Sequence, residues 1–385
     1  MRMLRLMISE DNHQALNMYM KLISVATFKV AAVFVVLHLY GCDSSPVERI
    51  HSGEAQGTTY MIKYNGDESV TQLQVDSVIE SMDVEMNTWR NDARITELNN
   101  FQSEASVFSF DDHNNIWSVI WDLSSEIHTD SDGAFDPTVK PLVDLWGFGL
   151  KHVDKVDSTD VDSIMRFVGF RPENIDLEGP ETSSARSETH IVKGDSRTQL
   201  DFNAIAQGYT VDMLIDLLLE SGIENAMVEL GGEVRCIGLN LKGLPWRIAV
   251  DKPVTNDGTG GRPLQAILEV QNASVCTSGN YRKFKEIQGV RVSHTIDPRT
   301  GYPAYHALLS VTIQAGSAAV ADAYATACMV LGPKDGRAFI DKMRREKSGP
   351  PIEALFIIDA GVNATLDVPF EFWATEGWEE AIIWL

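Results

Sequence analysis

Four separated stretches of this chain place oxygen-bearing side chains beside Gly, Ala or Pro, where a core element would prefer bulk. They are residues 133–139 (GAFDPTV), 201–209 (DFNAIAQGY), 293–301 (SHTIDPRTG) and 321–327 (ADAYATA). Small residues let a backbone approach a ligand closely. Oxygen donors are the ligands that hard cations prefer. The sequence therefore indicates a cation site that serves an anionic ligand.

Asp322 and Thr326 are the best candidates for that cation site. They lie four residues apart in an Ala-rich segment that we expect to be helical, so both face the same side. A carboxylate, a hydroxyl and a nearby carbonyl form a partial Mg²⁺ shell, which water and phosphate would complete. The alternative is a helix–sheet packing face with one hydrogen-bonded Asp.

Two further side chains sit where a ligand could meet them. Asp201 comes just before a helix start at Asn203, and a helix start with an adjacent carboxylate can bind an anion and a ribose or base edge. The alternative is a simple cap pair. His294 lies between Ser293 and a turn, which suits a proton shuttle or a ligand-facing donor. A structural hydrogen bond is the alternative for His294.

Charge and missing motifs exclude several classes of protein. The formal net charge is −23, so there is no basic surplus for nucleic acid or for an anionic membrane surface. No Gly-x-Gly-x-x-Gly opens a helix, and neither a Walker lysine motif nor a Gly-x-Ser-x-Gly elbow is present. An acidic protein that binds phosphates needs a metal ion or backbone amides to do so.

The N-terminus has the pattern of an export signal. Lys21 and Lys29 precede an apolar run at 30–40, which ends at Gly41-Cys42. The run is shorter than the roughly 20 residues of a membrane span, although an uncleaved anchor is the alternative. Met20 makes a more usual signal start than Met1. We expect the signal peptide at 1–41, Cys42 and a tether at 42–50, and the folded domain at 51–385.

Cysteine use fits an exported protein without a disulfide framework. Three cysteines remain after Cys42, namely Cys236, Cys276 and Cys328, and their spacing matches no zinc site. We expect all three to be buried as small hydrophobic residues. A bridge between one pair stays open.

Hydrophobic periodicity predicts the elements that must position these residues. Helices are expected at 75–86, 116–127, 203–219 and 318–331, the third capped by Asn203. Strands are expected at 51–64, 226–230, 235–239, 246–251, 264–270, 308–314, 353–358 and 381–385. The polar stretch 171–198 is expected to be a loop or a variable hairpin. Because no linker or repeat is visible, we predict one intertwined α+β (mixed α/β) domain after a lipoprotein signal.

Taken in order, these motifs resemble one family, the ApbE-type FAD:protein FMN transferases. The resemblance covers about residues 50–360. It includes residues 57–60 (GTTY), 88–92 (TWRND), 98–99 (LN), 134–137 (AFDP), 201–209, 231–233 (GGE), 277–281 (TSGNY), 293–301 and 321–326. Leu39-Tyr40-Gly41-Cys42 is similar to a bacterial lipobox, in which Cys42 would be lipidated.

The resemblance implies a set of site residues. FAD contacts fall on Gln56, Trp89, Ala134, Phe135, Asp136, Asp201 and Gln207, with Ser293 near the pyrophosphate. Magnesium ligands fall on the Ala204 carbonyl, Asp322 and Thr326. This chain departs from the family at two of these positions, since many members have Met in place of Gln56 and Lys or Glu in place of Gln207.

The implied reaction moves the FMN part of FAD to a Thr or Ser hydroxyl of a target protein and releases AMP. Mg²⁺ would offset the charge of the pyrophosphate. We expect His294 to accept the hydroxyl proton, with Asp322 as its competitor. The implied targets are flavoproteins such as subunits of sodium-pumping NADH:quinone oxidoreductase or Rnf-type complexes. The implied location is the bacterial inner membrane, by a lipid anchor, facing the periplasm.

Other functions remain open at this point. With water as acceptor, the same site would be a Mg²⁺-dependent FAD pyrophosphatase that yields FMN and AMP. A lipoprotein that binds FAD without chemistry is a second alternative. A solute-binding lipoprotein would need two similar lobes, and the sequence shows no such duplication.

Overall fold

The computed structural model describes residues 47–66, 68–102, 107–149, 153, 155–178, 188–253, 263–280, 284–287, 290–361 and 370–385. Within it, Glu48–Leu385 forms one compact unit. The predicted signal peptide and Cys42 lie outside the described residues. No helix in the described ranges combines the length and apolar character needed to cross a bilayer.

An eight-stranded sheet forms the centre of the fold. Its strand order is β1-β2-β6-β7-β10-β15-β16-β17, and every neighbouring pair is antiparallel. The strands are β1 (Glu48–Ala55), β2 (Thr58–Asn65), β6 (Ala226–Leu230), β7 (Glu233–Ile237), β10 (Ala273–Gly279), β15 (Leu308–Ala315), β16 (Glu353–Asp359) and β17 (Phe370–Ala374).

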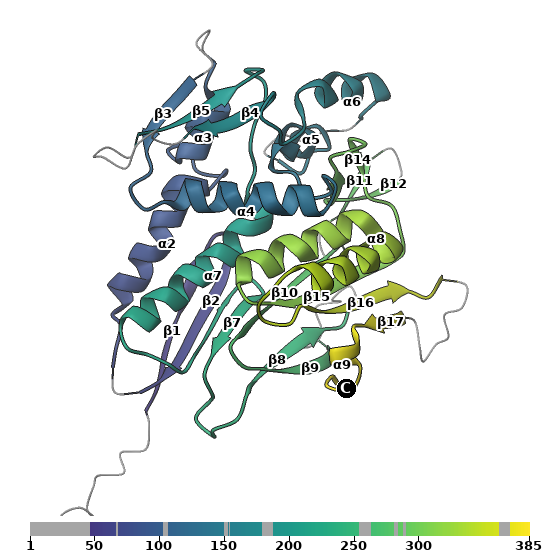
Figure 1. Cartoon of the computed structure of the whole chain (residues 1–385). Coiled ribbons are helices and arrows are strands. Elements are labelled where there is room, and N and C mark those ends of the chain that lie inside the picture. The colour runs from purple at the N-terminus through teal and green to yellow at the C-terminus, as the bar shows by residue number, and fades with distance from the viewer. Residues whose placement is uncertain are drawn as a thin grey trace, which may run out of the picture. The chain divides into compact units, whose positions relative to one another are not determined.

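Helices cover one face of this sheet and a small second sheet covers the other (Figure 1). The helices are α2 (Gln72–Met86), α4 (Ile116–Asp130), α7 (Asn203–Glu220) and α8 (Ala318–Glu346). The second sheet has the order β18-β9-β8. Its strands are β8 (Trp246–Asp251), β9 (Leu264–Val270) and β18 (Ile383–Trp384), and the short helix α9 (Glu376–Glu379) lies beside them.

Each face has its own apolar core because each strand alternates its side chains between the two faces. On β6, Val228 is buried under the helices, whereas Met227 packs against the second core. Trp246, Val250 and Leu268 fill that second core from the small sheet.

Shorter elements complete the helical side. They are α3 (Arg94–Asn100), α5 (Lys140–Leu145), α6 (Ser158–Ile164), the 3₁₀ turns η1 (Pro137–Val139) and η2 (Met165–Phe167), and a sheet of β3 (Val107–Asp111), β5 (Glu188–Lys193) and β4 (Ile175–Glu178). Two small hairpins pair β11 (Phe284–Ile287) with β12 (Val290–Ser293), and β13 (Ile296–Asp297) with β14 (Tyr302–Pro303).

Most predicted elements are confirmed, and three are corrected. The strand expected at 51–64 is two strands, because Gln56, in a left-handed conformation (φ 49°), turns the chain back at Gly57. The first of these strands begins at Glu48, inside the segment expected to be a tether. Within 171–198, where a loop or a hairpin was expected, β4 and β5 pair antiparallel, so the hairpin is confirmed. The helix expected to end at 331 continues to Glu346 across a break.

The break in α8 has an identifiable cause. Gly332 has φ 80°, and Pro333 follows it without a backbone N–H. The Met329 carbonyl, which residue 333 would ordinarily satisfy, instead meets the Nε2 of His306 at 2.8 Å. The Leu308 N–H donates to the other ring nitrogen, Nδ1, at 3.2 Å. A side chain from outside the helix therefore replaces the missing donor.

The cysteine prediction is confirmed. Cys236, Cys276 and Cys328 are buried free thiols, and none of the three is in a disulfide. Burial raises the pKa of all three thiols, so they behave as small apolar residues.

Candidate functional site

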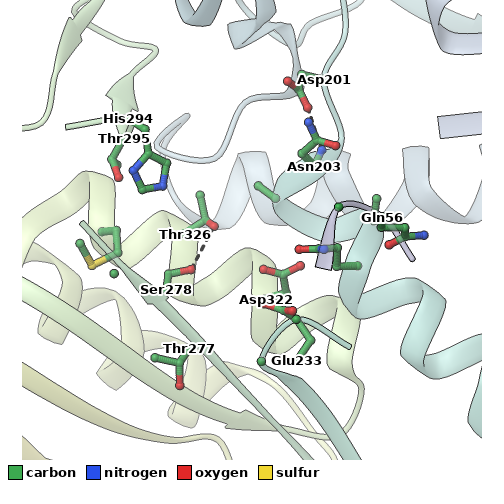
Figure 2. Close-up of a pocket in the computed structure, with 18 of the residues that line it drawn as sticks. Gln56, Asp201, Asn203, Glu233, Thr277, Ser278, His294, Thr295, Asp322 and Thr326 are labelled. Atoms are coloured by element: carbon green, nitrogen blue, oxygen red, sulfur yellow. Dashed lines mark hydrogen bonds between the residues drawn. The ribbon is translucent and has the colours of Figure 1, made fainter. Parts of the chain in front are cut away.

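A cavity of about 1000 Å³ opens where α7 and α8 meet the ends of the central strands. Figure 2 shows side chains from α7, α8, the start of β7 and the loop after β12 around this space. All but one of the residues predicted for the site line it, namely Gln56, Trp89, Ala134, Phe135, Asp136, Asp201, Ala204, Gln207, His294, Asp322 and Thr326. Segments far apart in sequence are thus brought to one place.

The close crossing of α7 and α8 builds the centre of the site. A Cβ on Gly208 would lie 2.3 Å from the Ala318 carbonyl oxygen, so only glycine allows this approach. The Gly208 N–H donates to Oδ2 of Asp322 at 3.3 Å. In a regular helix that N–H also points toward the carbonyl of Ala204, four residues earlier. The Asp322 carboxylate and the Ala204 carbonyl therefore lie close together.

Asp322 is a buried carboxylate in a polar corner. It is only 6% exposed, and burial raises its pKa to about 7, against the lowering effect of the Gly208 N–H. One helical turn along α8, the Thr326 hydroxyl lies 3.4 Å from the hydroxyl of Ser278 (Figure 2). A carboxylate, two hydroxyls and a backbone carbonyl thus gather at this point of the cavity.

Asp212 holds the start of α8 in place. Its two carboxylate oxygens accept the backbone N–H groups of Ala318 and Ala319, each at 2.9 Å. Arg235 of β7 donates to the same carboxylate at 2.7 Å. Because these N–H groups belong to the first turn of α8, Asp212 fixes the helix one turn before Asp322.

The Asp201 end of the cavity is formed by two chain segments that bond to each other. The Asp201 N–H donates to the Pro137 carbonyl at 2.8 Å, and its carboxylate accepts the Asn203 N–H at 2.8 Å (Figure 2). Burial raises the pKa of Asp201, and Lys140, which also lines the cavity, opposes that shift. The expected cap is corrected, because Asn203 is the first helical residue and Asp201 supplies the bond to its N–H.

The Asp136 carboxylate accepts hydrogen bonds from its own turn and from a second segment of the chain. Its carboxylate accepts the Thr138 N–H at 2.7 Å and hydroxyl at 2.5 Å, and the Phe170 N–H at 3.0 Å. Nδ1 of His128 lies 3.7 Å away. Burial raises the Asp136 pKa, against these bonds. The carboxylate therefore shapes the loop that presents Ala134 and Phe135 to the cavity.

The remaining predicted residues occupy the rim and walls. Trp89 is 60% exposed and lines the cavity, so it lies at the opening. Gln56 donates to the Thr210 hydroxyl of α7 at 2.9 Å. His294 also lines the cavity, with its ring 6.3 Å from that of Phe148. Ser293 is the exception, because it does not line the cavity and its hydroxyl accepts the Thr295 N–H at 3.0 Å.

The structure adds residues to which the sequence assigned no role. Glu233 is 8% exposed and lines the cavity beside the β6–β7 turn. Burial is the main cause of the raised pKa of the Cys276 thiol, and the charges of Asp322, Glu233 and Asp212 add to it. Ser278 and β8 also line the cavity. Glu233 and Ser278 lie in the GGE and TSGNY motifs, and that membership was the only sign in the sequence that they belong to the site. No motif marks the residues of β8.

The predicted cation site is not a cluster of acids. In the described ranges, no group of three or more His, Cys, Asp or Glu side chains is placed to hold a metal ion. The predicted ligands are one carboxylate (Asp322), one hydroxyl (Thr326) and the Ala204 carbonyl, and the Glu233 carboxylate lines the same cavity. This composition suits a cation that keeps water or a phosphate in its shell.

Comparison with known proteins agrees with this geometry. A profile of the ApbE family matches residues 56–348. The chain is 37% identical to an FAD:protein FMN transferase of Vibrio cholerae over 315 residues, covering 80% of this chain and 89% of that protein. A Haemophilus influenzae protein of the same name is 31% identical and covers 79% and 86%, respectively.

Solved structures agree with the sequence comparison. The flavin transferase ApbE from Vibrio cholerae superposes with a TM-score of 0.70 at 31% identity, over 86% of this chain and 98% of that one. The apo flavinyl transferase ApbE from Pseudomonas stutzeri gives 0.71 at 31% identity, over 87% and 97%. The predicted family, mixed fold and transferase class are confirmed by these comparisons. The chain belongs to the ApbE family.

Proposed function

We propose that this chain is a Mg²⁺-dependent FAD:protein FMN transferase that joins FMN to a Thr or Ser hydroxyl by a phosphoester bond and releases AMP. One observation carries the proposal: the oxygen ligands around Asp322, the α7 start near Asp201 and His294 line a single cavity. The relatives from Vibrio cholerae and Haemophilus influenzae, which are 37% and 31% identical to this chain, are named FAD:protein FMN transferase.

The oxygens around Asp322 fit a magnesium ion. A carboxylate buried to this degree, with a raised pKa and a long 3.3 Å bond to Gly208, lacks a strong partner of opposite charge among its described contacts. Asp322, Thr326 and the Ala204 carbonyl would hold the ion. When bound, Mg²⁺ would supply positive charge against the pyrophosphate and the charge that develops on it.

The proposed transfer forms one P–O bond and breaks another, so it needs no reactant besides FAD and the acceptor. The acceptor oxygen attacks the phosphorus on the FMN side of FAD, and the bond from that phosphorus to the bridging pyrophosphate oxygen breaks. AMP leaves with that oxygen. The proton of the attacking hydroxyl goes to His294, and Asp322 is less suited to accept it because it serves as the cation ligand.

The chain's other residues bind and orient FAD in this proposal. Gln56, Trp89, Ala134, Phe135, Asp136, Asp201 and Gln207 would contact it, directly or by shaping the loop. Ser293 would act through the backbone of its segment, since its hydroxyl already accepts the Thr295 N–H. The start of α7 supplies backbone dipoles that favour an anion.

The proposed acceptors are flavoproteins such as subunits of sodium-pumping NADH:quinone oxidoreductase or Rnf-type complexes. Lipidation at Cys42 would keep the enzyme on the periplasmic face of the inner membrane, beside such complexes. The support is the signal-like sequence at 1–41 and the Gly41-Cys42 pair that ends it.

The test is mass spectrometry of an acceptor subunit incubated with the protein (Cys42 onward), FAD and Mg²⁺, with and without EDTA. A Mg²⁺-dependent gain of one FMN, with AMP released, supports the proposal. Free FMN and AMP beside an unmodified acceptor would indicate a pyrophosphatase. Intact FAD in every sample would indicate a binding protein and overturn the proposal.

A further inference from the structure

The cavity has a second wall that the residues of the proposed flavin and metal sites do not explain. It consists of Met227 and Glu229 of β6, and of residues 247–251 of β8. On β6, the buried residues alternate with these two, so the cavity touches only one face of that strand. The pattern on β8 is different.

Five successive residues of β8 line the cavity, from Arg247 to Asp251. Side chains of successive strand residues point to opposite faces, so a space on one face would touch every second residue. A space lined by all five runs along the edge of the strand, where backbone N–H and C=O groups point. The groove therefore follows the β8 backbone.

β8 is an edge strand of the small sheet, and the groove follows its open side. Among the described residues, the small sheet has the order β18-β9-β8, so β8 pairs with β9 on one side only. Trp246 and Val250 bury their side chains in the second core and hold the strand firmly. Ala249 is exposed and small, so it leaves the edge accessible.

We infer that the β8 edge is the docking site of the acceptor protein, whose target Thr or Ser enters the cavity on an extended segment paired with β8. The inference rests on the proposed function, which requires a protein hydroxyl to reach the same cavity. Pairing an extended segment with a free strand edge is a general mode of peptide recognition, and the backbone bonds supply the affinity.

The charges of the groove narrow the kind of segment that fits. Glu229 and Asp251 are acidic and Arg247 is the one cation in this wall. Like charges across an interface weaken it. The segment that binds is therefore expected to be free of acidic residues where it passes Glu229 and Asp251.

The test uses an acceptor subunit whose target Thr is replaced by Val, which binds without reacting. Hydrogen–deuterium exchange of the full protein with FAD and Mg²⁺ is compared with and without this subunit. Slower exchange is expected at those amides of 247–251 that point away from β9, because pairing with a new strand protects them. Binding of the subunit without protection there would overturn the inference.

A matched pair of variants gives an independent readout. Ala249→Trp fills the groove, whereas Glu269→Trp places the same ring at an exposed site on the neighbouring strand β9, outside the cavity. Ala249→Trp should raise the acceptor KM about tenfold or more, with the FAD Kd changed less than about twofold. Glu269→Trp should change neither.

The outcomes separate the two proposals. Transfer by the wild-type protein tests the proposed function alone. If transfer occurs and Ala249→Trp leaves the acceptor KM unchanged, the docking site is wrong and the function stands. If Ala249→Trp weakens FAD binding as much as acceptor binding, the groove holds flavin, and the docking inference is likewise overturned.

Discussion

At the scale of single residues, the chemistry of the site depends on where a few oxygens are buried. Asp322 is held among packed helices, and its carboxylate accepts the backbone N–H of Gly208 at 3.3 Å. Such a carboxylate is costly to keep charged, which is why its pKa rises to about 7. A buried charge at this position lowers the free energy of unfolding, but it provides an anionic ligand for a cation.

Replacing Asp322 should therefore separate stability from activity. We expect Asp322→Asn to lower the Mg²⁺-dependent transfer rate by about 100-fold or more, because the anionic ligand is lost. The thermal midpoint in EDTA should stay the same or rise, because Asn can still accept the Gly208 N–H without a buried charge. Rate assays and thermal unfolding check both parts.

The control for that variant is Asp216→Asn, a change at an exposed position of α7. It should leave the rate within about twofold. Full Mg²⁺-dependent activity in Asp322→Asn would refute the assignment of the cation site.

His294 should affect the rate more than binding. If it accepts the proton of the attacking hydroxyl, His294→Ala lowers kcat by about 100-fold while the FAD Kd changes by less than about threefold. His113→Ala, at an exposed site, is the matched control. Equal losses in kcat and in FAD affinity would mean that His294 positions FAD and moves no proton.

At the scale of elements, the crossing of α7 and α8 is what assembles the oxygens. Gly208 lets the two helices touch, Asp212 caps α8 from α7, and the break at Gly332 ends the first part of α8. Met329 and Val330, just before the break, line the cavity. The geometry of the site is thus set by contacts that take no part in the chemistry.

Adding one methyl group at the crossing should disturb both stability and activity. Gly208→Ala would bring a Cβ within 2.3 Å of the Ala318 carbonyl oxygen, so the helices must separate. We expect a loss of about 2–4 kcal/mol in the free energy of unfolding and a weaker Mg²⁺ dependence. Urea unfolding measures the first, and a Mg²⁺ titration of the rate the second. An unchanged unfolding curve would show that the crossing tolerates a side chain.

The contribution of His306, beside the break in α8, to the free energy of unfolding should depend on pH. Burial lowers the pKa of His306, against the raising effect of its bond to the Met329 carbonyl. The neutral ring can donate to that carbonyl and accept the Leu308 N–H. Below about pH 6.5 the unfolded chain takes up a proton that the folded chain resists, so stability from this residue is present above that pH and lost as the pH falls.

Two variants test that role. His306→Ala leaves the Met329 carbonyl without its donor and should cost about 1–3 kcal/mol at pH 8. His306→Gln keeps a neutral donor and should lose less, while removing the decline in stability toward pH 5. Urea unfolding at both pH values gives the comparison, and an identical pH dependence in wild type and His306→Gln would contradict the assignment.

At the scale of the whole molecule, one sheet separates two cores, and the helical core includes a buried lysine. Lys193 is 2% exposed, and its ammonium donates to the Leu98 carbonyl at 2.9 Å. Burial lowers its pKa to about 8. The folded chain therefore releases this proton at a lower pH than the unfolded chain, whose lysine has a pKa of 10.5.

The sign of the effect follows from that difference. Between pH 8 and 10.5 the unfolded chain holds the proton and the folded chain does not, so this residue makes stability rise with pH. Lys193→Met should remove that rise and increase the free energy of unfolding at pH 7 by about 1–2 kcal/mol. The Leu98 carbonyl keeps a partner, because the Phe101 N–H also donates to it. Denaturation at pH 7 and 10 measures both effects, and a less stable Lys193→Met would contradict the prediction.

Local pattern was sufficient where an element depends on its own residues. The strands at 246–251 and 264–270 have the predicted limits, and α4 begins at the predicted Ile116. Periodicity failed where the chain turns without a Pro–Gly or Asn–Gly signal, as at Gln56, and where α8 resumes beyond Gly332, because His306 offsets the missing N–H of Pro333.

The family, the mixed fold and the residue types of the site could all be predicted from the sequence, because motifs read in order along the chain carry them. Tertiary structure alone decided three things: that Glu233 and Ser278 share the cavity with Asp322, that the Ser293 side chain does not line it, and that β8 runs along its edge. The physical reason is that these depend on contacts between segments distant in sequence. Such contacts arise from the helix crossing at Gly208 and the packing of two sheets, which no local pattern records.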